Sequence, residues 1–316
     1  TRLHKLMGWI SIFWALSNGK DIILTFPGMY TESILDMIII LDGWSALTYL
    51  AFLYELTRPG WLTKKHLLIA SMPFAIYTGA YFIYPCHTMI YYVVSFLVIF
   101  GLYITIIGYR HSVSYMNYIR NYYSNIDEIN ISWLRKVFLL AAASLLVWLF
   151  TALTENYLAD CLYYIISISI WQMVVCHCRN LKQVKPEETE EIIEEERNCE
   201  EDLKNDDERK FPFAGTLEEM IENERLYLQP SLALDDLAKR LNTNRTYLSS
   251  YFSKVISKSF YDYINELRIK QKSIPMLEEH PDYTLEQVAQ ESGFNSLSTF
   301  RRAFRKITGM TPGEYR

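Results

Sequence analysis

The sequence has little cysteine, and the cysteines it has do not form a framework. Five are present, and their spacing fits neither a set of disulfides nor a zinc site. Cys176, His177 and Cys178 bring metal-ligand types together, but no fourth ligand is near them, so we interpret them as ordinary packed side chains. Cys86 and Cys161 remain candidates for a disulfide. The sequence therefore predicts a protein without a metal or another cofactor.

Catalytic groupings are also lacking. No long apolar run or loop pairs a nucleophile with a base, carries a phosphate-binding loop or gathers a metal triad. We therefore predict that the chain is not an enzyme.

Residues 6–178 lack the polar faces that helices of a soluble core present. Instead, long apolar runs follow one another, each near the ~20 residues that a helix needs to cross ~30 Å of hydrocarbon. We predict a transmembrane domain over residues 1–178. Its spans, about six in number, are expected at Leu6–Pro27, Ile34–Tyr54, His66–Tyr84, Met89–Gly108, Val137–Leu153 and Leu158–Cys178. The chain begins at Thr1 without methionine, so a seventh span upstream stays open.

Alternate loops between the predicted spans lack lysine and arginine. The loops near Tyr30, Pro85 and Asn156 carry none, whereas the intervening segments carry several. Because basic residues favour the cytoplasmic side, the N-terminus and everything after Cys178 are predicted to be cytoplasmic. The expected location is the bacterial inner membrane, with several passes and a cytoplasmic C-terminal domain.

Charged residues interrupt the first two predicted spans. They are Lys20, Asp21, Asp36 and Asp42. An unpaired charge in lipid is costly, which makes such residues functional candidates. Lys20 and Asp42 have similar predicted depths, and two interpretations stay open: a structural ion pair between adjacent helices, or a polar pocket for a signal molecule.

Residues 179–215 differ sharply in composition from the apolar runs. Between Glu187 and Glu208, thirteen acidic residues accompany two basic ones. Such a block is typical of a solvated spacer or a charged helix. We predict an acidic linker here, followed by a cytoplasmic domain over residues 216–316.

Acidic residues are absent from Gly293 to Gly313. Before this stretch, Thr284 has a glutamine three residues later, which is the capping-box spacing that begins a helix. Gly293 ends that helix, because a sharp turn requires a residue that tolerates positive φ. A second helix follows, with Phe300 and Phe304 facing inward and basic side chains facing outward. Two short helices joined in this way are typical of a helix-turn-helix.

The same pattern occurs once before, as an internal repeat. The offset is 51 residues in the first helix and 52 in the second. The matching pairs are Leu234 and Leu285, Leu237 and Val288, Ala238 and Ala289, Asn242 and Gly293, Leu248 and Phe300, Phe252 and Phe304, Lys254 and Lys306, and Tyr263 and Tyr315. Asn242 suits the turn because asparagine tolerates the left-handed conformation. Helix-turn-helix units are therefore predicted near residues 234–254 and 285–306.

The runs LALDDLAKRLNTNRTYLSSYFSKV, SFYDYINELRI and the closing GF…F…AFRK…GMTPGEYR resemble the DNA-binding domain of AraC-type (AraC/XylS family) transcription regulators. The resemblance covers roughly residues 226–316. It implies two helix-turn-helix units joined by a long helix, Phe260 to about Leu277, with two recognition helices in successive major grooves. The base-reading positions that it implies, with Arg305 added from the same basic face, are Arg245, Thr246, Ser249, Ser250, Ser298, Thr299, Arg301, Arg302 and Arg305.

Three residues depart from the family's pattern. Ser257 stands where the second copy has Gly309, which should cost the turn some stability. Ala233 stands where a capping serine or threonine is usual, although two aspartates that suit the helix dipole follow it. Pro275 lies inside the expected connecting helix and should kink it.

The predicted fold class is therefore all-α: a polytopic transmembrane helical bundle followed by a cytoplasmic domain of two helix-turn-helix units joined by a long helix. The leading hypothesis is a membrane-anchored, sequence-specific transcription regulator that couples a signal sensed in or across the membrane to promoter binding. Its expected partners are double-stranded promoter DNA, the lipid bilayer, RNA polymerase, a second copy of the chain and an unidentified signal ligand. The alternative is a membrane transporter or receptor with a regulatory helix-turn-helix tail, which would favour polar stripes through several spans.

Overall fold

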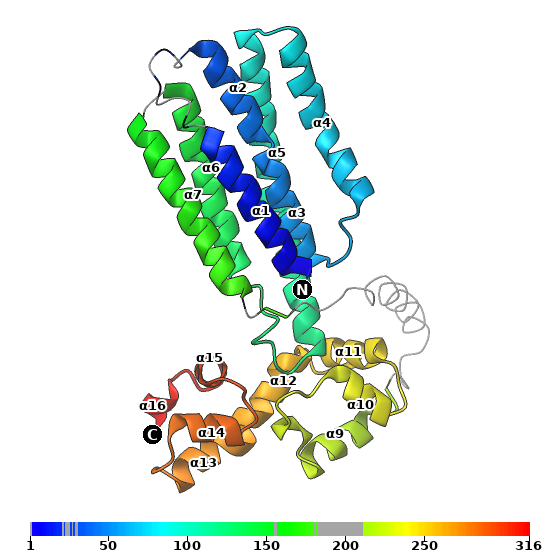
Figure 1. Ribbon diagram of the computed structural model, residues 1–316. Coiled ribbons are helices and arrows are strands. Elements are labelled where there is room, and N and C mark those ends of the chain that lie inside the picture. The colour runs from blue at the N-terminus through cyan, green and yellow to red at the C-terminus, as the bar shows by residue number, and fades with distance from the viewer. Residues whose placement is uncertain are drawn as a thin grey trace. The chain divides into compact units, whose positions relative to one another are not determined.

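The computed structural model describes residues 2–20, 22, 26, 28, 31–154, 157–179, 181–182 and 211–316, and the regular elements among them are helices (Figure 1). The all-α prediction is thus confirmed. The chain divides into two compact units, which we call unit 1 (Thr1–Tyr115 with Ile131–Lys185) and unit 2 (Met116–Asn130 with Pro186–Arg316). Asp21 and the acidic block 187–208 lie outside the described residues.

Unit 1 is built from long apolar helices. They are α1 (Arg2–Gly19), α2 (Glu32–Gly43), α3 (Ser45–Thr57), α4 (Lys64–Ile83), most of α5 (His87–Tyr122), α6 (Leu134–Thr154) and α7 (Tyr157–Cys178). Among the described residues, four stretches are long and apolar enough to cross a membrane: Glu32–Thr57, Lys64–Ile83, His87–Tyr122 and Cys161–Cys178. These coincide with four of the predicted spans, and the other two remain predictions.

Helices α2 and α3 form one apolar stretch that is interrupted at Trp44, and α4 packs closely against them. A side chain at position 43 would bring its Cβ within 2.5 Å of the Tyr77 hydroxyl, so Gly43 permits this close approach. The core beside it is apolar and aromatic. Its buried members are Ile40, Leu47, Phe74, Tyr77, Tyr81, Ile90, Val93, Val94 and Leu97.

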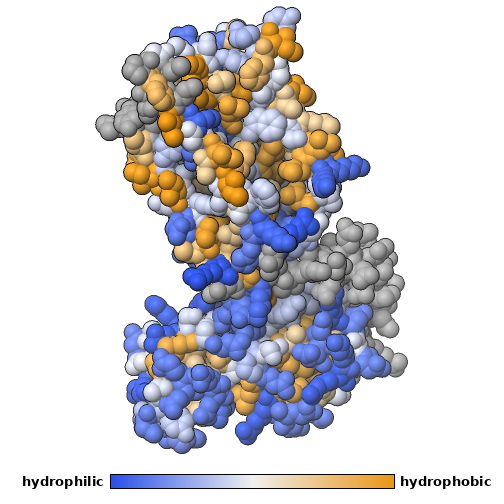
Figure 2. All heavy atoms as spheres, viewed as in Figure 1, coloured by the Kyte–Doolittle hydropathy of each residue, from blue (hydrophilic) through white to orange (hydrophobic). Residues whose placement is uncertain are grey.

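The surface of unit 1 carries many large apolar side chains, whereas the visible surface of unit 2 is largely hydrophilic (Figure 2). Exposed examples on unit 1 are Ile76, Tyr92, Ile99, Leu146 and Ile168. An apolar surface of this extent on several helices suits contact with lipid rather than water.

Unit 2 contains short helices in the order of two successive helical hairpins. The first group is α9 (Ala214–Asn223), the 3-10 turn η3 (Leu226–Leu228), α10 (Leu234–Arg240) and α11 (Arg245–Lys254). After the connecting segment, α12 (Phe260–Leu267), η4 (Arg268–Ser273) and α13 (Ile274–Glu279), come α14 (Leu285–Glu291), α15 (Leu297–Thr308) and α16 (Pro312–Tyr315). Each hairpin has its own core: Leu237, Leu248 and Phe252 in the first, Val288, Phe300 and Phe304 in the second.

The predicted start and turn of the second hairpin are confirmed. The Gln287 backbone N–H donates to Thr284 Oγ1 at 3.2 Å, and the Thr284 N–H donates to Gln287 Oε1 at 2.9 Å, which completes the capping box. Gly293 has φ +82°, and a Cβ there would lie 2.6 Å from the Leu228 carbonyl oxygen. Glycine is therefore required at this turn by both its backbone conformation and its neighbour.

The first hairpin reaches the same geometry with less suitable residues. Asn242 adopts φ +51°, as predicted, and Ser257 adopts φ +57° where the second copy has glycine. A serine backbone in the left-handed conformation is strained, so this turn is expected to be less stable than the one at Gly309. Ala233 offers no capping side chain, but its own N–H donates to Asp236 Oδ2 at 3.1 Å.

The connecting helix expected from Phe260 to about Leu277 runs without a break from Phe260 to Glu279, but part of it is widened. Helix α12 ends at Leu267, and residues 268–273 form a wider π-helical turn before α13. Pro275 has no N–H and its ring clashes with the carbonyl one turn earlier, so the α-helical ladder must open before it. Ser273 Oγ donates to the Arg268 carbonyl at 3.0 Å and satisfies a group that the opened ladder exposes.

Candidate nucleic-acid interface

Helices α11 and α15 are the second helices of the two hairpins, and side chains cap both at the N-terminus. Asn244 Oδ1 accepts from the Tyr247 N–H at 2.6 Å, and Ser296 Oγ accepts from the Thr299 N–H at 3.3 Å. The caps fix where each helix begins, and the N-terminal residues of a recognition helix are those that contact base edges.

Helix α15 separates aromatic and basic side chains onto opposite faces. Phe300 and Phe304 are fully buried, one turn apart, and their rings meet edge to face. The opposite side exposes Ser298, Arg301, Arg302 and Arg305. Exposed guanidinium groups donate to phosphates and, in bidentate geometry, to guanine. This face therefore has the chemistry of a DNA-reading surface.

Helix α11 exposes fewer of its predicted DNA-binding side chains to solvent than α15 does. Arg245 and Ser250 are half-buried, whereas Thr246 is 1% exposed and Ser249 is 8% exposed. These two short side chains lie on the inward side of α11 and do not reach solvent in this conformation. The base-reading positions that the resemblance implies are thus only partly accessible in the first hairpin.

Thr299 on α15 is also buried, at 4% exposure, and its hydroxyl is engaged. Arg302 Nη2 donates to Thr299 Oγ1 at 3.3 Å, and Thr299 Oγ1 donates to Asp127 Oδ1. Asp127 belongs to unit 2 although 172 residues separate it from Thr299. The sequence placed residues 116–130 inside the transmembrane domain, so this contact was not anticipated.

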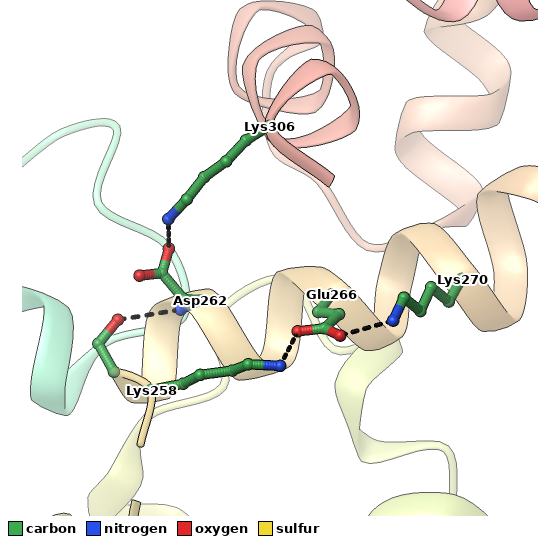
Figure 3. A network of polar contacts seen from close by, with 6 residues as sticks. Lys258, Asp262, Glu266, Lys270 and Lys306 are labelled. Atoms are coloured by element: carbon green, nitrogen blue, oxygen red, sulfur yellow. Dashed lines mark hydrogen bonds and ion pairs between the residues drawn. The ribbon is translucent and has the colours of Figure 1, made fainter. Parts of the chain in front are cut away.

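One ion pair ties the second hairpin to the connecting segment, and two more lie along that segment (Figure 3). Lys306 Nζ lies 2.7 Å from Asp262 Oδ1, and Glu266 receives Lys258 at 2.5 Å and Lys270 at 2.7 Å. The hydrogen bonds from Lys258 and then Lys270 hold the pKa of the Glu266 carboxyl below its usual range. Four charged side chains of α12 and its neighbours are thus engaged in local pairs, and the arginines of α15 are exposed beside them.

Arg268 is a structural residue that the sequence analysis missed. It is 1% exposed, and its guanidinium donates to the carbonyls of Tyr227 at 2.6 Å and Gln229 at 2.7 Å, and to Asn265 Oδ1 at 3.2 Å. Burial lowers the pKa of Arg268 to about 10, so it keeps its charge at neutral pH. The sequence signal that could have indicated its burial is the spacing of four residues from Ile264, which places both side chains on one face of the helix.

The charged residues within the first two predicted spans fall into two separate groups where the structure describes them. Lys20 Nζ lies 2.6 Å from Asp42 Oδ1. Asp36 instead accepts from the Tyr81 hydroxyl at 3.3 Å and lies 3.0 Å from His87 Nδ1. The structure therefore brings Lys20 and Asp42 together, pairs Asp36 with other residues, and leaves Asp21 outside the described part of the chain.

Asp42 also lines a cavity of about 160 Å³ within unit 1. Its wall is mostly apolar and includes the aromatic side chains of Trp14, Tyr49, Trp148, Tyr163 and Trp171. A carboxylate and a few other polar groups in a largely apolar wall are the usual composition of a small-molecule site, in which the polar groups orient a largely apolar ligand.

The cysteines do not form the candidate disulfide. Cys86 and Cys161, on the approach to α5 and on α7, are both free thiols, so this candidate pairing is not formed. Across the residues that the structure describes, no cluster of histidine, cysteine and acidic side chains has the makings of a metal site.

The comparisons with known proteins agree with the geometry of unit 2. Residues 237–316 match the family model described as "Helix-turn-helix domain". The C-terminal part of the chain is therefore a helix-turn-helix domain of the AraC type, a class of DNA-binding domain.

Several curated regulators are similar over this same part. The uncharacterized HTH-type transcriptional regulator YtdP of Bacillus subtilis is 34% identical over 88 residues, which is 28% of this chain and 11% of that protein. The Msm operon regulatory protein of Streptococcus mutans is 33% identical over 86 residues, 27% of this chain and 30% of that protein. The B. subtilis regulator YdeC is 31% identical over 100 residues, 32% of this chain and 34% of that protein. The chain thus spans between 11% and 34% of the length of these relatives, and no solved structure matches it.

Proposed function

We propose that this protein is a membrane-anchored, sequence-specific transcription regulator that couples a signal sensed in or across the membrane to promoter binding. Helix α15 carries the proposal: its buried Phe300 and Phe304 fix the helix in a core, and its arginines are exposed on the opposite face. The helix-turn-helix match supports regulation of transcription rather than enzymatic catalysis.

In this proposal, the DNA contacts divide by chemistry. Arg301 and Arg302 read bases from α15, while Arg305 and Lys306 meet phosphates. Arg245 and Ser250 contribute from α11, and the buried Thr246, Ser249 and Thr299 act in DNA binding only after a rearrangement that exposes them. Promoter DNA and RNA polymerase are the proposed partners, together with a second copy of the chain.

Unit 1 is proposed to lie in the bacterial inner membrane, crossing it about six times, with the C-terminal domain in the cytoplasm. Four apolar stretches of sufficient length and an apolar surface support this placement. The cavity at Asp42 supports a sensing role for unit 1, because it offers a largely apolar site at the Lys20–Asp42 pair. The same cavity also fits the alternative, a membrane transporter or receptor with a regulatory helix-turn-helix tail. The two proposals differ because the alternative does not require binding to promoter DNA.

Reporter fusions test the topology on which this proposal depends. A reporter active only in the cytoplasm should be active after Lys185 and inactive near Tyr30 or Asn156. The reverse pattern would remove both the orientation and the DNA-binding role, because the C-terminal domain would face away from the chromosome. Chromatin precipitation of the full chain then separates a regulator, which is recovered with promoter fragments, from a receptor or transporter, which is not.

A further inference from the structure

The end of α5 and the loop after it belong to unit 2, and we call this segment, Met116–Asn130, the α5 arm. It packs against the helix-turn-helix domain through both its backbone and its side chains. The arm is continuous in the chain with the candidate membrane span of α5. It is therefore a direct covalent route from one unit to the other.

The backbone of the arm pairs with the segment that precedes α10. Tyr123 forms an antiparallel bridge with Ala233, and the Ser124 N–H donates to the Leu232 carbonyl at 3.1 Å. Ser124 Oγ donates to the same carbonyl at 2.6 Å. These bonds position the arm in register beside the N-cap of the first hairpin.

Buried Arg268 reaches the arm from the connecting segment. Its Nη1 lies 3.4 Å from the Ser124 carbonyl, and its Nη2 lies 3.4 Å from Ser124 Oγ. These are long bonds, while the bonds to Tyr227 and Gln229 are short and involve the domain itself. Arg268 would therefore keep its two short hydrogen bonds if the arm left. Release of the arm would not leave the buried guanidinium without hydrogen-bond partners.

The arm contacts residues of both recognition helices. On α11, the Arg245 guanidinium lies over the Tyr122 ring, 5.7 Å from its centroid, and Tyr122 is buried in the core of the first hairpin. On α15, the Thr299 hydroxyl donates to Asp127. Arg245 and Thr299 are two of the positions at which the family resemblance implies base contacts. The arm thus contacts residues that are expected to contact DNA.

Where the arm contacts α15, it presents a negatively charged group, as the phosphates of DNA would. Asp127 presents a carboxylate to Thr299, which also accepts from Arg302. Asp127 Oδ2 is buried without a hydrogen-bond partner among the described residues. An acidic group against an arginine-bearing recognition helix takes the place of a phosphate, and it cannot remain there when DNA binds.

We propose that the α5 arm is an autoinhibitory segment that competes with duplex DNA for the recognition helices. This inference rests on the proposed DNA-binding function and adds its regulation. The docked arm holds Thr299 buried and engages Arg245, so DNA binding requires the arm to leave. When the docked state predominates, the apparent affinity for DNA falls in proportion to the fraction of released protein.

The test uses the full chain in lipid nanodiscs and a short random-sequence DNA duplex as the probe. Asp127→Asn weakens the bond to Thr299 and removes the charge, and should tighten duplex binding roughly tenfold, as the loss of one charge-assisted hydrogen bond allows. Glu128→Gln is the matched control, because it removes an equal charge one residue along the arm and leaves the Asp127–Thr299 bond in place. It should change the affinity by less than about twofold. Hydrogen exchange of the Ser124 amide reports docking independently, because this N–H donates to the Leu232 carbonyl of the domain. It should be protected without DNA and exposed when DNA is added.

Three results would overturn the proposal. Equal tightening by both variants would reduce the effect to overall charge. Unchanged affinity in Asp127→Asn, with wild type binding DNA, would show that the arm does not inhibit. Rapid exchange of the Ser124 amide without DNA would show that the arm is not docked. If neither wild type nor variant binds duplex DNA at any salt concentration, the proposed function fails first and takes this inference with it.

Discussion

Lys306 on α15 and Asp262 on α12 form an ion pair, with Nζ 2.7 Å from Oδ1 (Figure 3). The lysine side chain is 61% exposed, so the pair gains at most about 1 kcal/mol in water. Such a pair orients Lys306 without preventing it from turning to a phosphate. We therefore expect Lys306 to contact phosphate, whereas Arg301 and Arg302 of the same helix are expected to contact bases.

The first prediction follows from this pair. Lys306→Ala should weaken the binding of selected and random DNA alike and reduce the salt slope of binding by about 1, because one phosphate contact is lost. Asp262→Asn frees the same ammonium group and should not weaken binding. Titrations of both variants across a series of salt concentrations provide the measurement. A loss confined to the selected sequence would assign Lys306 to base reading instead.

The second prediction concerns the exposed arginines of α15. Arg301→Ala or Arg302→Ala should reduce the preference for a selected sequence over random DNA by roughly 1–3 kcal/mol, the usual worth of a good base contact. The sequence would first be selected by wild-type protein from a random pool. Competition between the two DNAs then measures discrimination, with Lys306→Ala as the control that lowers both affinities. Preferences unaltered in both arginine variants would mean that these side chains do not read bases.

The third prediction concerns the core of the second hairpin. Phe304 is fully buried, with its ring against those of Phe300 and Tyr315, so Phe304→Ala should cost ~3–5 kcal/mol. That loss is comparable to the whole stability of a small domain. Amides of α14 and α15 should then exchange rapidly in the full chain, whereas exposed Arg305→Ala should leave them protected. Equal protection in the two variants would contradict the buried position of Phe304.

The fourth prediction concerns the charged pair of unit 1. Lys20→Met and Asp42→Asn should each lower the amount of protein in the membrane, because either change leaves one partly buried charge without its 2.6 Å partner contact. The double variant should recover much of the loss, and quantitative blots of membrane fractions measure it. Additive losses would mean that the pair is not what stabilises these residues.

Promoter regulation by the same double variant distinguishes the two interpretations of the pair. A structural pair predicts normal regulation once the protein is present. A pair that belongs to a signal site predicts a protein that is present but fixed in one regulatory state, since Asp42 lines the cavity.

Much of unit 2 was predictable because its determinants are local. The capping box of Thr284 and Gln287 and the left-handed turns at Asn242 and Gly293 depend on residues within one or two helical turns. The inward phenylalanines of α15 follow from helical spacing alone. The apolar runs of unit 1 are equally local, since length and composition decide whether a helix suits a membrane.

Other features depend on more than the pattern of one helix. The widened turn before Pro275 replaces a simple kink, because the opened ladder is stabilised by the bond from Ser273 to Arg268. Thr246 and Ser249 are polar and were predicted to face DNA, yet small rotations of a short helix decide whether such side chains are inside or outside. Hydrophobic periodicity constrains the apolar face and leaves the flanking polar positions undetermined.

Local patterns in the sequence specify an all-α chain, its apolar stretches, its two helix-turn-helix units and the basic face of α15. The burial of Arg268 and the place of residues 116–130 in unit 2 depend instead on long-range packing. The same holds for the contact of Asp127 with Thr299 and of Tyr122 with Arg245. These contacts join segments more than a hundred residues apart in the chain, and no local propensity, spacing or charge pattern specifies which distant surface a loop will pack against.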